Sequence, residues 1–405
     1  WEHRSEDELF HMGRRFEAIP EGGIWPDMVL ELRPTPTDED LGAFEVVWEW
    51  HVWDHLVQDE NEQAAGHGVV AEQPGRLDLN ALLADREETE AERKEREKLE
   101  EEMRALGYLG GDATARANPG GRGDRDSSRS ADWLHTNSID YLPDEDLIAL
   151  SVRGMDEVWV IDHGTTTAEA ATGEGGRRGR GGDLLWRWGN PAAHGGEGAQ
   201  VLYKQHDARW VLEAERPTLM IYNNGRGRPG DAKYSTVEVV QLPALEGRAD
   251  AAGAHLRTIG DDEDEPSFYS NFISGAQDLP GGNVLICSGA EARLIEVDPN
   301  GAVVWEWCND LPGAGDGGGR DGAGGPKGRP SPGERRGPGG PPDGPAPGDA
   351  SGDRPPGPPP GGRGERGARD GGRGGGPNGF FRATRYPSDH PGLSGLVSEA
   401  TPASD

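Results

Sequence analysis

Short apolar runs alternate with polar turn sequences along this chain, and the stretch Asp132–Asp162 shows the pattern most clearly. Leu134–Tyr141 has the composition of a strand, and Pro143–Asp146 is a turn signal before the next apolar run. Strands joined by such tight turns pair antiparallel. Similar runs recur, and we expect strands at 28–33, 45–53, 134–141, 147–153, 157–162, 183–188, 208–213, 218–223, 235–242, 272–278, 283–288, 292–297 and 302–307. Many short strands without interleaved helices predict an all-β protein.

A Trp-rich motif occurs three times, as EVVWEW at 45–50, DLLWRW at 183–188 and AVVWEW at 302–307. The stretches 141–162 and 278–307 also share one order of turn, strand, turn and strand. Each repeat is therefore expected to be a four-stranded meander closed by a Trp-rich strand. This pattern is typical of a β-propeller blade. We expect about four blades, some of them interrupted by insertions. A β-sandwich is the alternative, and the repetition favours the propeller.

Composition divides the chain into successive parts. The 65 Gly and 32 Pro residues are concentrated in biased segments, so the globular part is smaller than the 405 residues suggest. Residues 85–106 are nearly all Glu, Lys, Arg, Ala and Leu, which predicts a charged surface helix rather than a coiled-coil partner. The expected parts are a partial propeller at 1–60 that starts with a helical or irregular lead at 6–16, an insertion at 61–131, propeller blades at 132–311, a disordered Gly/Pro/Arg-rich segment at 312–378, and a C-terminal segment at 379–405 that returns to the propeller.

Candidate chemistry is concentrated in the hairpin predicted at 134–153. Folding the two strands about their turn puts His135 roughly opposite Arg153, at the end away from the turn. Asn137 is two residues from His135 and is expected to share its face of the strand. An imidazole, an amide and a guanidinium would then gather at one rim of a sheet.

The repeats extend this group to neighbouring blades. When 135–151, 206–223 and 272–288 are aligned, His206 occupies the place of His135, and Ser274 falls near the place of Asn137. Equivalent positions on successive blades converge on the central channel of a propeller. The expected site therefore contains two histidines, Asn137 and Arg153, and the guanidinium suits a sulfate or phosphate group.

Overall charge restricts the partners. The formal net charge is −32 at pH 7, which argues against nucleic acid and anionic membrane surfaces. An anionic substrate would need local positive charge, which Arg153 supplies. No run is apolar for long enough to span a bilayer. Two cysteines, Cys287 and Cys308, permit one disulfide at most, and two separate reduced thiols are the simpler interpretation.

Simpler explanations exist for each residue. A histidine near a strand start often only hydrogen-bonds a turn, although two in repeat register beside an arginine argue for more. Two histidines with Asp207 would suit zinc, but an arginine is a poor neighbour for a cation, so we expect no metal. His51 and His55 are expected to serve packing and hydrogen bonding, with a substrate-binding role for His55 left open.

Several motifs in order give the chain a family resemblance. It resembles the bacterial arylsulfotransferases, the aryl-sulfate sulfotransferases that do not depend on a nucleotide donor, from about Trp25 to Leu393 outside the insertions. The motifs are WEWHVWDHLVQD, DWLHTNSIDY, SVR with EVWVIDHGTTT, GDLLWRWGNP, QHDARW, YNNGRGRP, SFYSNFISGAQDLPGGNVLIC and FRATRY. The resemblance implies a six-bladed propeller that uses no cofactor and moves a sulfuryl group from a phenolic sulfate ester to a phenol. The transfer is ping-pong and passes through a sulfated histidine, and members are exported, commonly to the periplasm.

The resemblance also implies roles for single residues. His206 falls on the nucleophile, Arg153 on the sulfate-contacting arginine, and His135 and Asn137 on the His-x-Asn motif. Ser274 falls near a hydroxyl residue of the channel. His135 would also protonate the leaving phenolate and deprotonate the incoming phenol.

The family's upstream His-His-Asp stretch has no counterpart here, so about two blades are expected to precede Trp1. The alternatives left open are a non-catalytic propeller that binds a ligand or protein, and a metal-dependent hydrolase.

Overall fold

The computed structural model describes residues 1–37, 41–83, 130–211, 213–230, 233–260, 267–309 and 379–386, with His390 and Leu393. The chain divides into one compact unit of Trp1–Gly313 with Gly375–Asp405 and a second of Ala314–Gly374. All described residues belong to the first unit. The helix expected at 85–106 and the Gly/Pro-rich segment expected at 312–378 lie outside the described residues.

Strands dominate the described residues, which confirms the all-β prediction. The helices are α1 (Glu6–Met12) and α3 (Thr167–Ala170), and the short 3₁₀ turns are at Phe16–Ala18, Val52–His55, Val70–Glu72, Arg153–Met155, Pro191–His194 and Gly289–Glu291. The strands are β1 (Met28–Pro34), β2 (Phe44–His51), β3 (Leu56–Val57), β4 (Leu77–Asp78), β5 (Thr136–Leu142), β6 (Leu147–Val152), β7 (Glu157–Asp162), β8 (Trp186–Trp188), β9 (His206–Trp210), β10 (Thr218–Asn223), β11 (Thr236–Gln241), β12 (Ala254–Ile259), β13 (Ser274–Asp278), β14 (Val284–Ser288), β15 (Arg293–Val297) and β16 (Val303–Cys308).

Helix α1 is shorter than the lead expected at 6–16 because both of its ends are capped. The hydroxyl of Ser5 accepts from the Glu8 amide, and the Glu8 carboxylate accepts from the Ser5 amide. Gly13 then adopts a left-handed conformation and ends the helix.

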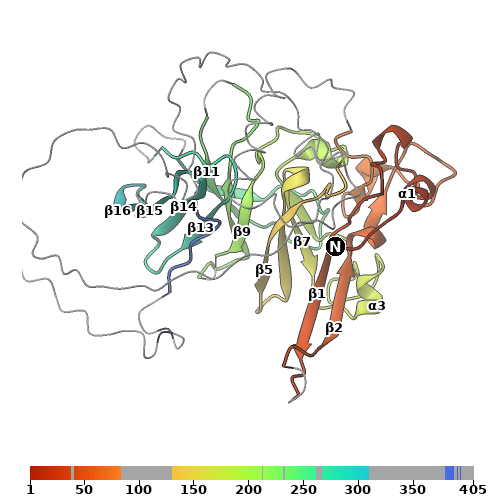
Figure 1. Ribbon diagram of the computed structural model, residues 1–405, viewed down its shortest axis with the longest axis horizontal. Coiled ribbons are helices and arrows are strands. Elements are labelled where there is room, and N and C mark those ends of the chain that lie inside the picture. Colours follow the sequence, from red (N-terminus) through yellow and green to blue (C-terminus); the bar gives the residue numbers. More distant parts are fainter. Residues whose placement is uncertain are drawn as a thin grey trace, which may run out of the picture. The chain divides into compact units, whose positions relative to one another are not determined.

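Apart from the two-stranded parallel pair of β3 and β4, the sheets are antiparallel and follow the chain order (Figure 1). Three of them have four strands each, with orders β5-β6-β7-β8, β9-β10-β11-β12 and β13-β14-β15-β16, while β1 and β2 form a two-stranded sheet. Trp-rich strands close the first and third of these sheets, as the repeats predicted. The second is closed by β12, which the sequence analysis missed because only one of its six residues, Ile259, is buried.

Alternate residues along one strand enter different hydrophobic cores. On β6, Ile148 and Leu150 join the core shared with the β1–β2 hairpin, whereas Leu147 and Ala149 join the core shared with β10. Strand β10 repeats this division toward the third four-stranded sheet. Both faces of β6 and β10 are therefore buried, which explains why these strands read as continuous apolar runs.

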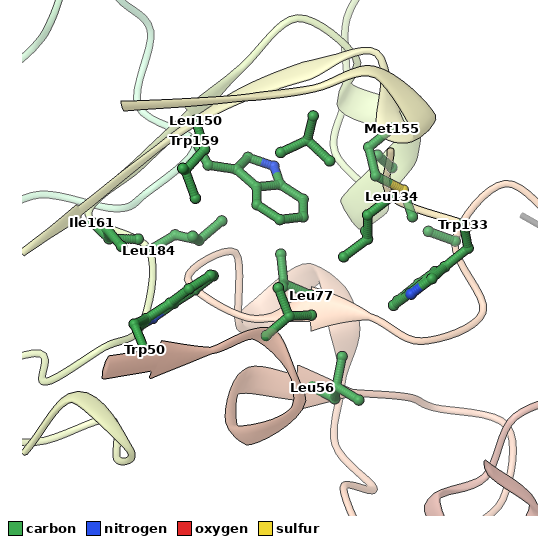
Figure 2. Packing of buried hydrophobic residues seen from close by; sticks show 14 of the residues in the cluster. Trp50, Leu56, Leu77, Trp133, Leu134, Leu150, Met155, Trp159, Ile161 and Leu184 are labelled. Atoms are coloured by element: carbon green, nitrogen blue, oxygen red, sulfur yellow. The ribbon is translucent and has the colours of Figure 1, made fainter. Parts of the chain in front are cut away.

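The first core lies between the hairpin and the sheet β5–β8. Figure 2 shows Trp50 of β2 and Trp159 of β7 converging on one interior with Leu77 and Leu184. Burying each such side chain contributes on the order of 1.5–3 kcal/mol relative to exposure, so this packing holds the hairpin against the sheet.

First strands of successive sheets lie next to one another. Strand β9 contacts β5 on one side and β13 on the other. Four of the predicted site residues lie at the starts of these three strands: His135, Asn137, His206 and Ser274. In the described residues the hydrogen-bonded sheets are separate, so closure into a propeller and the number of blades stay predictions.

Two further sequence predictions have outcomes here. Cys287 is buried and Cys308 is exposed, and both are free thiols, as the simpler interpretation held. Among the described residues, no helix combines the length and the apolar character needed to cross a membrane.

Candidate functional site

The β5–β6 hairpin puts His135 beside Arg153, as predicted. Thr136 pairs with Val152, so the residues that flank this pair meet at the end away from the turn. Gly154 donates from its amide to the Leu134 carbonyl at 2.6 Å. A Cβ at position 154 would lie 2.0 Å from the Trp133 carbonyl oxygen, so only glycine permits this close approach.

His135 is oriented by a carboxylate three residues earlier. Its Nδ1 lies 2.5 Å from Oδ2 of Asp132, and because a carboxylate only accepts, Nδ1 carries the proton. Burial acts to raise the pKa of Asp132, but the hydrogen bond from His135 and the charges of His135 and Arg153 outweigh it and lower that pKa. The His135 side chain is 40% exposed, so its Nε2 edge is open to a substrate.

Asn137 is placed by a bulge rather than by simple alternation. The register shifts between Thr136 and Ser138, and His135 has a left-handed φ of 50°, so the argument that His135 and Asn137 share a face does not hold. Asn137 donates from Nδ2 to the Gln205 carbonyl at 2.8 Å. Its Oδ1 is buried with no hydrogen-bond partner among the described residues and is therefore an acceptor available to a ligand.

His206 is the buried histidine of the site, 5% exposed at the start of β9. Its Nδ1 lies 2.8 Å from Oδ1 of Asn224 and 3.2 Å from the Lys204 carbonyl. Asn224 in turn donates from Nδ2 to the Ser270 carbonyl at 2.6 Å and to the Ser274 hydroxyl at 3.0 Å. The Ser270 carbonyl can only accept, so it fixes which end of the amide faces His206.

This arrangement determines the tautomer of His206. Two oxygens face Nδ1, so Nδ1 carries the proton and Nε2 keeps its lone pair. Nε2 makes no hydrogen bond within the described residues. Burial, with the positive charge of Arg153, lowers the pKa of His206 to about 3, against the opposing hydrogen bond to Asn224. The ring is therefore neutral at pH 7.

The pairing registers correct the repeat alignment. His206 pairs with Tyr222, the penultimate residue of β10, whereas Thr136 pairs with Val152, the last residue of β6. His206 thus lies further into its sheet than His135 does. Both histidines still share one neighbourhood, because the charges of Arg153 and His135 act on the pKa of His206.

A cavity of about 410 Å³ is lined by one of the predicted site residues, Asn137. Its wall is largely apolar and comes from β1, β2, β5, β6 and β7, and it includes Asp27, Asn137 and Arg382. The other cavity, of about 730 Å³, lies along β14–β16 and residues 383–385 and contains none of the predicted site residues. We therefore associate the smaller cavity with the site despite its size.

Comparison with known proteins gives one match to a family. The model of the arylsulfotransferase (ASST) family matches residues 40–294, more than half of the chain. The chain belongs to the arylsulfotransferase family. No curated protein matches this chain. It is also similar, at 15% identity and a TM-score of 0.25, to a crystal structure of a protein of unknown function from Bacteroides caccae. That match covers 43% of this chain and 46% of the other, so the chain spans about half the length of that protein.

Two of the predicted substrate contacts need correction. His55 is fully buried, with Nδ1 2.8 Å from Asp183 and Nε2 2.8 Å from the Ala170 carbonyl, and it stacks on Trp50. Both of its nitrogens are used, so it holds α3 against β2 and offers nothing to a substrate. Ser274 does reach the site, but it is 1% exposed and acts through Asn224.

The zinc alternative is not favoured by the geometry. Asp207 is ion-paired with Arg209 and Arg382 instead of joining the two histidines. Within the described part of the chain, no three His, Cys, Asp or Glu residues are grouped as metal ligands.

Sequence reasoning missed four residues of the site. Asp132 is the first residue of the stretch Asp132–Asp162 and lies three residues before His135, but sequence reasoning assigned it no role. Asn224, Phe381 and Arg382 lie in the motifs YNNGRGRP and FRATRY, which carried the family resemblance. The ring of Phe381 meets that of His206 edge-on, with centroids 6.4 Å apart.

We expect the buried His206 to make stability depend on pH. An unfolded histidine has a pKa of about 6.5, whereas that of His206 in the folded protein is about 3. Between these values the unfolded state binds a proton that the folded state does not. The free energy of unfolding should therefore fall as pH falls from about 6 toward 3, by up to about 1.4 kcal/mol per pH unit.

Carboxylates titrate in the same pH range. The contribution of His206 is therefore measured as the difference in unfolding free energy between the unaltered protein and a variant without this histidine. Urea unfolding of the unaltered protein and of His206→Gln should be compared at pH 7, 6, 5 and 4. The two stability curves should converge as pH falls, and parallel curves would contradict a depressed pKa.

Proposed function

We propose that this arylsulfotransferase moves a sulfuryl group from an aryl sulfate to a phenol by a ping-pong reaction through sulfated His206. The observation that carries the proposal is the buried, neutral imidazole whose Nδ1 proton is held by Asn224, leaving the Nε2 lone pair unshared. A nucleophilic histidine needs this tautomer and this protonation state.

In the first step, Nε2 of His206 forms a bond to sulfur while the bond from sulfur to the aryl oxygen breaks. The electron pair leaves with the phenolate oxygen. The imidazole gains positive charge as it attacks, and Oδ1 of Asn224 and the Lys204 carbonyl face the proton that carries this charge. Arg153 offsets the negative charge on the sulfuryl oxygens.

His135 is proposed as the general acid and base. Asp132 holds its Nδ1 proton and so directs Nε2 toward the open side of the site. His135 enters the first step with both ring nitrogens protonated and gives the Nε2 proton to the leaving phenolate, and the neutral ring then takes a proton on Nε2 from the acceptor phenol in the second step. In that second step the phenol oxygen bonds to sulfur, the bond from sulfur to Nε2 breaks, and neutral His206 is restored.

The cavity of about 410 Å³ is proposed to receive the aryl ring. Trp50, Leu150 and Trp159 give it apolar walls, and the free Oδ1 of Asn137 would accept the hydroxyl proton of a phenol. Its volume lies within the range of about 300–1,000 Å³ that small-molecule pockets show.

The fold that carries this site is proposed to be a β-propeller with the three four-stranded sheets as consecutive blades. Face-to-face packing through separate cores and the contact of β9 with β5 and β13 support the proposal. In a propeller these first strands line the channel. Export, to the periplasm or outside the cell, is likewise proposed on the family resemblance.

The test is incubation with 4-nitrophenyl sulfate, first alone and then with phenol. We expect one equivalent of 4-nitrophenolate to be released without phenol, and continuous release once phenol is added. Mass spectrometry of the protein taken before phenol addition should find one sulfuryl group on His206. Binding without release would sink the proposal and favour a non-catalytic, ligand-binding propeller.

A further inference from the structure

Residues 379–386, here called the C-terminal strap, are fixed beside the start of β13. The Phe380 amide donates to the Gly289 carbonyl at 3.1 Å. Toward the other end, the Arg385 amide donates to Gln277 at 2.8 Å, and Gln277 donates back to the Arg385 carbonyl at 3.1 Å. These contacts place the middle of the strap, Phe381 and Arg382, against the residues around His206.

Arg382 is anchored through one of its nitrogens. Its Nε lies 3.1 Å from Oδ1 of Asp207, which directly follows His206 and is 1% exposed. Gly275 makes room for this pair, because a Cβ there would lie 2.3 Å from Oδ2 of Asp207 and 3.4 Å from Cγ of Arg382. The fold therefore accommodates the ion pair between Arg382 and Asp207 only because residue 275 is a glycine.

Arg382 also borders a cavity. Arg382 lines the cavity of about 410 Å³ together with Asn137 and Asp27. Among the described residues, its Nη atoms make neither a hydrogen bond nor an ion pair, since the only ion pair is through Nε. Burial raises the pKa of Asp27, the acidic residue of this wall.

We propose that Arg382 is a second substrate-binding arginine in addition to Arg153, and that it holds the sulfate oxygens of the aryl sulfate while the aryl ring occupies the apolar part of this cavity. The proposal rests on the function proposed above. Anchoring through Nε presets the planar Nη edge, and such an edge suits two oxygens of a sulfate group. In a protein of net charge −32, a second fixed cation at the cavity also raises the local concentration of an anionic substrate.

The test compares Arg382→Gln with Arg385→Gln in the full chain. Arg385 lies on the same strap but pairs with Glu296 and lines the other cavity, so it is a matched control. The rate of 4-nitrophenolate release in the absence of phenol is measured against the concentration of 4-nitrophenyl sulfate. Losing a charge-assisted hydrogen bond should raise the half-saturating concentration roughly 10- to 100-fold in Arg382→Gln. Arg385→Gln should match the unaltered protein, and Arg382→Lys should recover part of the loss.

An unchanged half-saturating concentration in Arg382→Gln, or an equal change in Arg385→Gln, would overturn the inference. If the unaltered protein releases no 4-nitrophenolate, the proposed function fails separately. Calorimetric titration with inorganic sulfate then decides about Arg382 alone. Weaker sulfate binding by Arg382→Gln than by Arg385→Gln supports the role, and equal or absent binding refutes it.

Discussion

Replacing His206 with alanine is expected to abolish sulfuryl transfer, with kcat falling by about 10⁴-fold or more, the scale on which removal of a catalytic nucleophile acts. His206 combines burial, a neutral ring and a free nitrogen lone pair. The single-turnover release of 4-nitrophenolate and the sulfuryl group detected by mass spectrometry should vanish together. Activity that survives in this variant would show that the nucleophile is another residue.

His135→Gln is the matched control, because it removes a histidine from the same site while leaving His206 in place. A general acid matters least when the leaving group is already stable as an anion, as nitrophenolate is. This variant should therefore still form the sulfated enzyme from 4-nitrophenyl sulfate. Its turnover with a less acidic phenol as leaving group should fall by about 10²- to 10⁴-fold. Equal losses with both donors would contradict the acid–base role.

Replacing Asn224 with leucine is expected to reduce kcat by about 10²- to 10⁴-fold, on the scale seen where a catalytic imidazole loses the partner that fixes its tautomer. Leucine has a similar volume but cannot accept the Nδ1 proton of His206. The ring would then sample the tautomer that places a proton on Nε2 and removes the attacking lone pair. Because substrate binding does not use Asn224, KM should change little.

Ser274→Ala provides the control for this positioning role. It removes one of the two acceptors for Nδ2 of Asn224 and keeps the Ser270 carbonyl, which alone fixes the amide. Its effect on kcat should stay below about tenfold, as for the loss of one neutral hydrogen bond. Nitrogen NMR of the His206 ring should report the proton on Nδ1 in Ser274→Ala and a mixture in Asn224→Leu. An unchanged tautomer in the leucine variant would refute the mechanism.

Local patterns were enough to place most strands and the first part of the site. Strands such as β6 and β10 contribute alternate residues to two cores, so their sequences are apolar throughout and their limits are clear. The closeness of His135 and Arg153 followed from one tight turn, because a hairpin register depends only on nearby residues. Strand β12 was missed since only one of its six residues is buried, so its sequence carries little burial signal.

The sequence by itself determined the all-β class, the repeated meanders, the hairpin that joins His135 to Arg153, and the choice of His206 as a candidate. Tertiary structure alone decided what each of these groups can do. Pairing of β9 with β10, in which Tyr222 lies opposite His206, brought Asn224 to Nδ1 of His206 and set the tautomer of the ring. Packing of β9 against β5 and β13 buried the ring, which lowered its pKa. Packing also used both nitrogens of His55 and brought Arg382 to Asp207. Burial of His206 and the contacts of His55 and Arg382 join residues far apart in sequence, and no local pattern encodes such contacts.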